Sequence, residues 1–232
     1  PNQSDLFVLN LAGNGKPLHI SDHEGQANFG AADVSADSST LYYPPNIDGE
    51  FATLKSYTFA DGNHGDVFAT DWDVSYAYFS RLGTYRVIGT NEDGYTKIRI
   101  TDETTGKEIE IPGLPDGTVT GVAFSNSERL MKFTVSSDTM PGNLFLYNLE
   151  SGELKQLTDT LNPEIDSGDL VASQVVRFAA RDGMTIPGPL YKPLGASAEN
   201  KVPVLLSIHG GPGGQSRAGY RASRQFLLNH GY

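Results

Sequence analysis

A hairpin pattern recurs along the first two-thirds of this chain and limits strongly what it can fold into. Two short runs of alternating apolar and polar residues, joined by a turn that contains glycine, are typical of a β-hairpin. Four segments have this pattern: DLFVLNLAGNGKPLHIS (5–21), LKSYTFADGNHGDVFAT (54–70), TKIRITDETTGKEIEIP (96–112) and NLFLYNLESGELKQLT (143–158). Their starts lie roughly 40–50 residues apart, which is the spacing of radial β-repeats.

A second piece recurs between the hairpins, at residues 32–43, 68–79 and 122–133. Each copy has an apolar start, a polar turn and an alternating strand. Two strands from this piece and two from a hairpin make a four-stranded sheet, which is the form of a propeller blade. We therefore predict a mostly β chain in which residues 1–165 form a partial β-propeller of about three to four blades. An all-β sandwich with similar hairpins is the alternative.

The pattern changes after residue 165. Residues 171–193 predict two strands around a turn, and VPVLLSI (202–208) is a continuous apolar run, as expected for a parallel strand buried on both faces. A glycine-rich loop and a helical pattern that ends near Gly231 follow it. Strand, loop and helix are the beginning of an α/β unit. We predict that residues 166–232 form the N-terminal part of an α/β-hydrolase domain.

The glycine-rich loop HGGPGGQ (209–215) admits several chemical interpretations. It lacks the lysine and the spacing of a phosphate-binding loop. Ser216 lies at the centre of GQSRA, but Ala218 occupies the position where a nucleophile elbow needs glycine. An oxyanion loop needs backbone N–H groups that no side chain obstructs, which explains the glycines. A tight turn without a ligand is the alternative.

The order of these motifs resembles the prolyl oligopeptidase family of serine peptidases. The resemblance rests on SIHGGPGGQS followed by RQFLLNHGY, after DGMTIPGPLYKP and the propeller-like repeats. It implies a β-propeller that covers an α/β-hydrolase domain with a Ser-His-Asp triad. It also implies hydrolysis of short peptides through an acyl-enzyme, of the acylaminoacyl- or dipeptidyl-peptidase type.

The resemblance assigns roles to three residues of the loop. His209 stands where two branches of the family carry a tyrosine, which is similar to the acylaminoacyl-peptidase branch. In that branch a backbone N–H binds the oxyanion, which here corresponds to Gly211, while His209 and Gly210 shape the loop. The 232 residues contain no G-x-S-x-G sequence. We therefore expect a fragment that is inactive alone, because an oxyanion hole needs a nucleophile to act with.

Composition limits the partners. The formal net charge is −11, and the lysines and arginines are scattered, so we expect neither a nucleic acid nor a membrane as partner. There is no cysteine and no metal-binding histidine spacing, and we expect no cofactor and no metal. Short peptides are the expected ligands, and the full-length enzyme could be a homo-oligomer. The sequence leaves the cellular compartment open.

Two other functions fit the same sequence. A propeller that binds a peptide or protein, next to a degenerate hydrolase segment, would need no catalytic residues. An esterase would use the same oxyanion loop, because that loop does not distinguish an ester from an amide. A G-x-S-x-G sequence after a further buried strand would discriminate the binding module from the enzyme.

Overall fold

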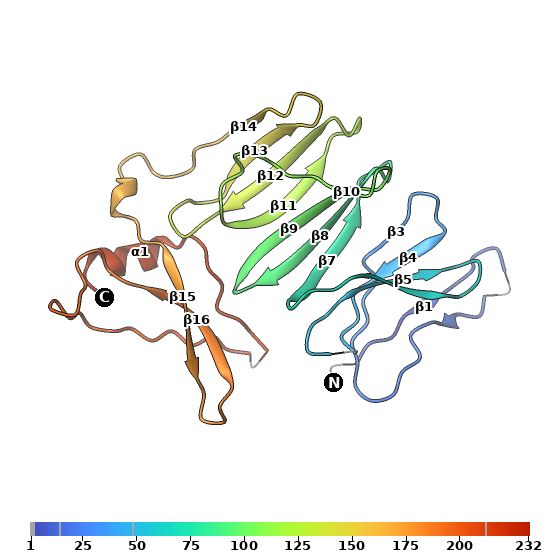
Figure 1. Cartoon of the computed structure of the whole chain (residues 1–232), viewed down its shortest axis with the longest axis horizontal. Helices are drawn as coiled ribbons and strands as arrows, with labels where there is room; N and C mark the ends of the chain where they lie inside the picture. The colour runs from blue at the N-terminus through green and yellow to red at the C-terminus, as the bar shows by residue number, and fades with distance from the viewer. Residues whose placement is uncertain (1–2, 14, 48, 212) are drawn as a thin grey trace. The chain divides into compact units, whose positions relative to one another are not determined.

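The computed structural model describes residues 3–13, 15–47, 49–211 and 213–232, and Figure 1 shows its strands and helix. The chain forms two compact units. The first comprises Pro1–Asn91 and Ile98–Glu110, and the second comprises Glu92–Lys97 and Ile111–Tyr232. The predicted domain boundary between residues 165 and 166 stays a prediction.

The first unit begins with a two-stranded hairpin and continues with two antiparallel four-stranded sheets, the second of which extends into residues 92–97. The hairpin strands are β1 (Phe7–Val8) and β2 (Leu18–His19). The first sheet contains β3 (Asp33–Val34), β4 (Thr40–Tyr43), β5 (Leu54–Thr58) and β6 (His64–Phe68). The second contains β7 (Asp73–Phe79), β8 (Tyr85–Glu92), β9 (Tyr95–Asp102) and β10 (Lys107–Glu108).

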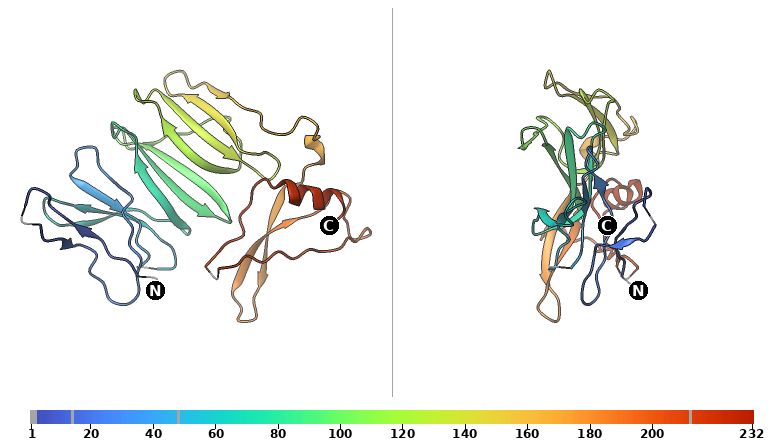
Figure 2. Two further views of the ribbon diagram at one scale, coloured as in Figure 1. Left: turned by 180° about the vertical axis from the view of Figure 1, so that it is seen from behind. Right: turned by 90° about the vertical axis from the view of Figure 1, so that its right-hand side faces the viewer.

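The second unit contains a four-stranded sheet, a two-stranded hairpin and one α-helix. The sheet is formed by β11 (Thr118–Phe124), β12 (Leu130–Ser136), β13 (Asn143–Asn148) and β14 (Leu154–Gln156). A short 3-10 helix (Ser167–Asp169) precedes the hairpin of β15 (Ser173–Ala179) and β16 (Thr185–Tyr191). The α-helix α1 spans Ala222–Asn229, and Figure 2 shows it at one end of the hairpin.

All four predicted hairpins are present, and the mostly β character is confirmed. In each four-stranded sheet the strands follow one another in sequence order. The pairs β3–β4, β4–β5, β5–β6, β7–β8, β9–β10, β11–β12, β12–β13 and β13–β14 are antiparallel. The turns at Gly62, Gly106 and Gly152 have φ values of 72°, 68° and 71°. Glycine adopts this left-handed conformation without steric cost, and for this reason the hairpin turns could be located from the sequence.

A second turn repeats at equal spacing along the chain. It joins the first two strands of each four-stranded sheet and begins at Ser35, Ser80 and Ser125, which are 45 residues apart. In each copy the serine hydroxyl accepts a hydrogen bond from the N–H five residues later, at 3.0, 2.9 and 3.2 Å. The residue three positions after each serine has a left-handed backbone: Ser38, Gly83 and Glu128. The three sheets therefore share their turn chemistry as well as their strand order.

The predicted repeat at residues 68–79 is displaced by one strand. Phe68 ends β6, and the next sheet begins only with β7 at Asp73. Its second strand, β8, was not predicted. Residues 87–90 in the middle of β8 are all buried, so this strand lacks the alternation of polar and apolar residues on which the prediction relied.

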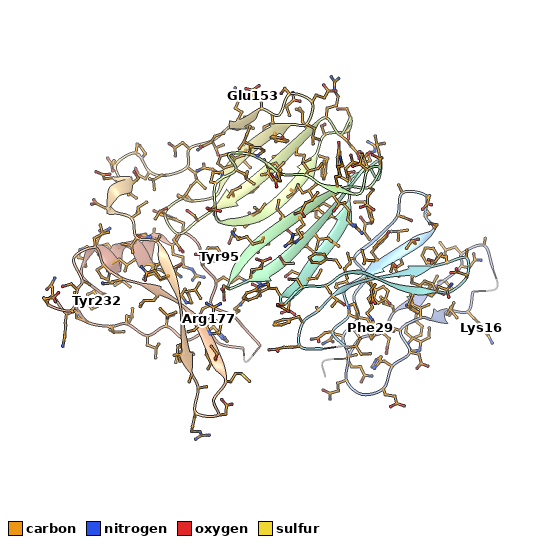
Figure 3. All side chains as sticks on the ribbon, in the orientation of Figure 1. Lys16, Phe29, Tyr95, Glu153, Arg177 and Tyr232 are labelled. Atoms are coloured by element: carbon orange, nitrogen blue, oxygen red, sulfur yellow. The ribbon has the colours of Figure 1, made fainter. Side chains whose placement is uncertain are left out.

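Buried apolar side chains fill the space beside each sheet. In the first unit one cluster gathers around Phe29 and Tyr43, and Phe29 is labelled in Figure 3. A second cluster contains Leu54, Val74 and Ile88. In the second unit the most deeply buried residues of the sheet are Met131, Phe133 and Val135, all on β12.

Gly89 of β8 lies directly under the ring of Tyr76. The two residues are paired across β7 and β8, and a Cβ added to Gly89 would overlap the ring atoms of Tyr76. We expect Gly89→Ala to lower the free energy of unfolding by about 1–3 kcal/mol, because overpacking forces the ring out of place. Urea denaturation would measure this. Gly30→Ala is the control, because nothing lies within 4 Å of its added Cβ, and equal midpoints for the two variants would contradict the prediction.

The hairpin around residues 181–183 and the helix near the C-terminus are confirmed, but the predicted strand before the helix is wrong. Residues 202–208 form no strand, and Val204, Leu206 and Ile208 are 88%, 78% and 79% exposed. A parallel strand is buried by its neighbours, and no described strand pairs with this segment. On α1, Phe226 is exposed, whereas Gln225 and Leu228 are buried.

Within the described part of the chain, no helix has the length and apolar character needed to cross a membrane.

Candidate functional site

The glycine loop is exposed, and its backbone conformation excludes a side chain at two positions. Gly211 has a φ of +134°, and a Cβ on it would lie 2.9 Å from the nitrogen of Gly214 and 3.2 Å from that of Gly213. A Cβ on Gly214 would overlap the carbonyl oxygen of Gly210. At Gly210 and Gly213 an added Cβ would meet nothing within 4 Å. The loop therefore needs glycine at 211 and 214 for its shape.

This curvature brings backbone nitrogen atoms together. The backbone nitrogen atoms of Gly213 and Gly214 both lie near the position that a Cβ on Gly211 would occupy, at the distances given above. The imidazole Nδ1 of His209 lies 3.1 Å from the carbonyl oxygen of Gly210. His209 thus contacts its own loop. Pro212 lies outside the described residues.

Ser216, the serine that follows the loop, has no activating base beside it. No histidine ring is hydrogen-bonded to its hydroxyl among the residues that the structure describes. Its carbonyl oxygen lies 3.2 Å from the position of a Cβ on Gly94. A serine becomes a nucleophile through an adjacent base. The surroundings of Ser216 therefore show packing, and they show no catalytic pair.

A buried carboxylate, Asp138, fastens the chain on either side of this loop. Asp138 is 4% exposed. Its Oδ2 accepts hydrogen bonds from the N–H of Ser173 at 2.9 Å, from the hydroxyl of Ser173 at 2.5 Å and from the hydroxyl of Tyr95 at 3.2 Å. Its Oδ1 accepts from the hydroxyl of Tyr191 at 2.5 Å and from the N–H of Gly219 at 2.8 Å. One carboxylate therefore joins β9, β15, β16 and the segment that leads into α1.

These contacts shift the pKa of Asp138 and of Tyr191. Burial raises the pKa of Asp138, but the hydrogen bonds from Ser173, Tyr191 and Gly219 outweigh it, so the net pKa lies below the ordinary value. Burial and the neighbouring Asp138 carboxylate raise the pKa of Tyr191. Asp138 is thus held as an anion, and Tyr191 is held as a neutral donor.

Two side chains of α1 complete the arrangement. Gln225 accepts a hydrogen bond from the N–H of Val171 and donates to the carbonyl oxygens of Val171 and Asp138, each at 2.9 Å. Arg224 donates to the hydroxyl of Tyr191 and to the carbonyl oxygen of Gly219, the latter at 3.1 Å. We call Asp138, Gln225 and Arg224 the anchor of α1. It explains why Gln225 is the buried polar residue of this helix.

The tip between β8 and β9 also contacts this region. The residues NEDGY (91–95) form this tip, with Asp93 and Gly94 both at positive φ. Asp93 forms an ion pair of 2.6 Å with Arg177 of β15, and the side chains of Arg177 and Tyr95 are labelled in Figure 3.

Sequential four-stranded antiparallel sheets have the form of propeller blades, and a glycine-rich turn can supply an oxyanion-hole N–H in α/β-hydrolases. Together these features favour the class of hydrolases that carry a propeller.

Comparison with known proteins agrees with this class. No protein-family model matches the sequence. Over 94 residues the chain is 33% identical to dipeptidyl aminopeptidase BIII of Pseudoxanthomonas mexicana, which covers 38% of this chain and 14% of that protein. Over 114 residues it is 26% identical to the uncharacterized peptidase YuxL of Bacillus subtilis, which covers 49% of this chain and 17% of that protein.

Solved structures show the same fold along nearly the whole chain. The match with puromycin hydrolase has a TM-score of 0.76 at 14% identity, and it covers 96% of this chain and 35% of the puromycin hydrolase chain. The match with a prolyl endopeptidase structure has a TM-score of 0.77 at 15% identity, and it covers 99% of this chain and 33% of the endopeptidase chain. The chain thus spans 14–17% of the length of its curated relatives. The resemblance to peptidases of the prolyl oligopeptidase family is confirmed.

Proposed function

We propose that this chain is part of a serine peptidase that hydrolyses short peptides, and that residues 209–214 form its oxyanion loop. The observation that carries the proposal is the loop itself, in which Gly211 and Gly214 cannot carry side chains. The sequence similarity to a dipeptidyl aminopeptidase supports the same reaction class. The three four-stranded sheets would be blades of a propeller that limits access to short peptides, and residues 166–232 would begin the hydrolase domain.

The proposed reaction is acyl transfer in two steps. A serine oxygen attacks the peptide carbonyl carbon, and the carbonyl oxygen becomes an oxyanion that backbone N–H groups stabilise. The C–N bond then breaks, the amine leaves with a proton from the catalytic base, and an acyl-enzyme remains. Water hydrolyses the ester and regenerates the serine. The N–H of Gly211 would donate to the oxyanion, while His209 and Gly210 would keep the loop in shape.

The nucleophile would come from residues other than these 232, because they contain no G-x-S-x-G sequence. We therefore expect a fluorophosphonate probe to label the product of the complete gene and to leave the 232-residue chain unlabelled. An acyl-amino-acid nitroanilide and a dipeptidyl nitroanilide, compared with a simple ester, would show whether the labelled protein cleaves amides. Labelling of the 232-residue chain, or none of the complete gene product, would contradict the proposal. The second outcome would favour the peptide-binding module.

A further inference from the structure

The second unit contains an open pocket of about 430 Å³ beside the segment that leads into α1. Ligand sites for small molecules typically measure about 300–1,000 Å³, so this volume suits a group the size of one or two amino-acid residues. The lining residues come from β11, the end of β12, the two residues before β13 and residues 217–221. They are Thr120, Ser136, Pro141, Gly142, Arg217, Ala218, Gly219, Tyr220 and Arg221.

The charge of this pocket is unbalanced. Two of its lining residues, Arg217 and Arg221, are cationic, and none is acidic. Neither arginine forms an ion pair with any residue that the structure describes, and Arg217 makes only a 3.3 Å hydrogen bond to the hydroxyl of Thr96. The nearby Asp138 carboxylate is buried and already accepts the hydrogen bonds of the anchor. Two guanidinium groups without an ion pair at one pocket, in a chain of net charge −11, favour an anionic ligand.

The backbone between the two arginines is fixed in place. Gly219 donates its N–H to Asp138 and accepts a hydrogen bond from Arg224 on its carbonyl oxygen. Its φ of +142° is a conformation that favours glycine. Arg217 and Arg221 lie two residues to either side of this anchored position. A binding site benefits when its polar groups are held before the ligand arrives.

The remaining lining suits an organic acid better than a bare inorganic anion. Thr120 and Ser136 add hydroxyl groups, while Pro141, Ala218 and Tyr220 add apolar surface beside the arginines. A guanidinium group matches a carboxylate with two parallel hydrogen bonds, and the apolar surface can contact the side chain next to that carboxylate.

We propose that this pocket binds the free carboxylate of a short peptide, with Arg217 and Arg221 as its partners. The proposal deepens the proposed peptidase function, because it names a chemical group of the peptide that the chain recognises. It assigns these two arginines a binding role only.

Isothermal titration calorimetry on the 232-residue chain tests the pocket without any catalytic activity. The probes are an N-acetylated dipeptide with a free C-terminal carboxylate, the same dipeptide as its C-terminal amide, and inorganic phosphate. We expect the Kd of the acid to be roughly ten times lower than that of the amide. One hydrogen bond to a charged group typically changes a Kd by about this factor. In Arg217→Gln/Arg221→Gln this preference should disappear.

Arg181→Gln is the matched control. Arg181 is an exposed residue of the turn between β15 and β16, so its replacement by glutamine removes one positive charge outside the pocket. The single variant Arg221→Gln, at an exposed side chain, provides a second test if the double variant fails to fold. The proposal is overturned if acid and amide bind equally, if Arg181→Gln weakens the acid as much as the pocket variants, or if phosphate binds as tightly as the acid. Fluorophosphonate labelling of the complete gene product is independent of these results, so the two proposals fail separately.

Discussion

Replacing Asp138 by asparagine is expected to lower the free energy of unfolding of the chain by about 3–5 kcal/mol, the usual cost of breaking a buried charged network from one side. The carboxylate accepts five hydrogen bonds, from Ser173, Tyr95, Tyr191 and Gly219. An asparagine amide keeps one acceptor oxygen but directs an NH₂ group at donors. At least two donors would then be buried without a partner. Urea denaturation followed by circular dichroism measures the loss.

Two further variants show whether the loss belongs to the network. Asp159→Asn makes the same chemical change at an exposed residue, and we expect it to change stability by less than about 0.5 kcal/mol. Ser173→Ala removes one hydroxyl donor and leaves the acceptor, so about 1 kcal/mol is expected. If Asp138→Asn costs no more than Asp159→Asn, the carboxylate does not hold this region together.

The same network predicts how the effect depends on pH. Burial raises the pKa of Asp138, but the hydrogen bonds from Ser173, Tyr191 and Gly219 lower it by more. The net pKa of Asp138 therefore lies below the ordinary 3.8. The folded state therefore binds this proton less readily than the unfolded state does, so the stabilisation is present above pH 3.8 and is lost as the pH falls through the folded pKa. The difference in unfolding free energy between the wild-type chain and Asp138→Asn should be constant near neutral pH and should shrink in acid below about pH 4. A difference that grows in acid would contradict the assignment.

The parts of the fold that could be predicted are those encoded locally. Each hairpin turn carries a glycine in the left-handed conformation, as at Gly62 and Gly152, between runs that alternate with a period of two. Strand β8 escaped prediction because four consecutive residues in its middle are buried, which removes the alternation. Polar turns were predicted within residues 32–43 and 122–133, which contain Ser35 and Ser125. Their shared hydrogen bond was not predicted, because a serine hydroxyl that accepts a backbone N–H leaves no distinctive composition.

The anchor of α1 could not be predicted from the sequence. Asp138 lies 35, 53 and 81 residues from Ser173, Tyr191 and Gly219, and an acid in a short polar turn is most often exposed. The error at residues 202–208 has a similar origin. Apolar composition shows that a segment can be buried, but burial itself depends on which strands lie beside it. The glycines of the loop could be singled out because the need for them at 211 and 214 is local and steric, whereas the role of the loop in binding an oxyanion stays a prediction.

Replacing Gly211 by alanine in the complete gene product is expected to lower kcat for peptide hydrolysis by roughly 100- to 1,000-fold, the usual cost of losing one oxyanion donor. Alanine strongly disfavours a φ of +134°, and its Cβ would lie 2.9 Å from the nitrogen of Gly214. The backbone must rotate, and the N–H of residue 211 turns with it. Steady-state kinetics with a peptide nitroanilide measures the loss, which should fall on kcat more than on KM because the interaction forms in the transition state.

Gly213→Ala separates this role from a general sensitivity of the loop. A Cβ at Gly213 meets nothing within 4 Å, so we expect kcat to stay within a few-fold of the wild-type value. Gly214→Ala should resemble Gly211→Ala, since its Cβ would overlap the carbonyl oxygen of Gly210. None of these variants should change the unfolding free energy of the 232-residue chain by more than about 1 kcal/mol, because the loop is exposed. If Gly213→Ala is as damaging as Gly211→Ala, or if Gly211→Ala leaves kcat unchanged, the oxyanion is stabilised by other groups, and the four glycines serve the turn alone.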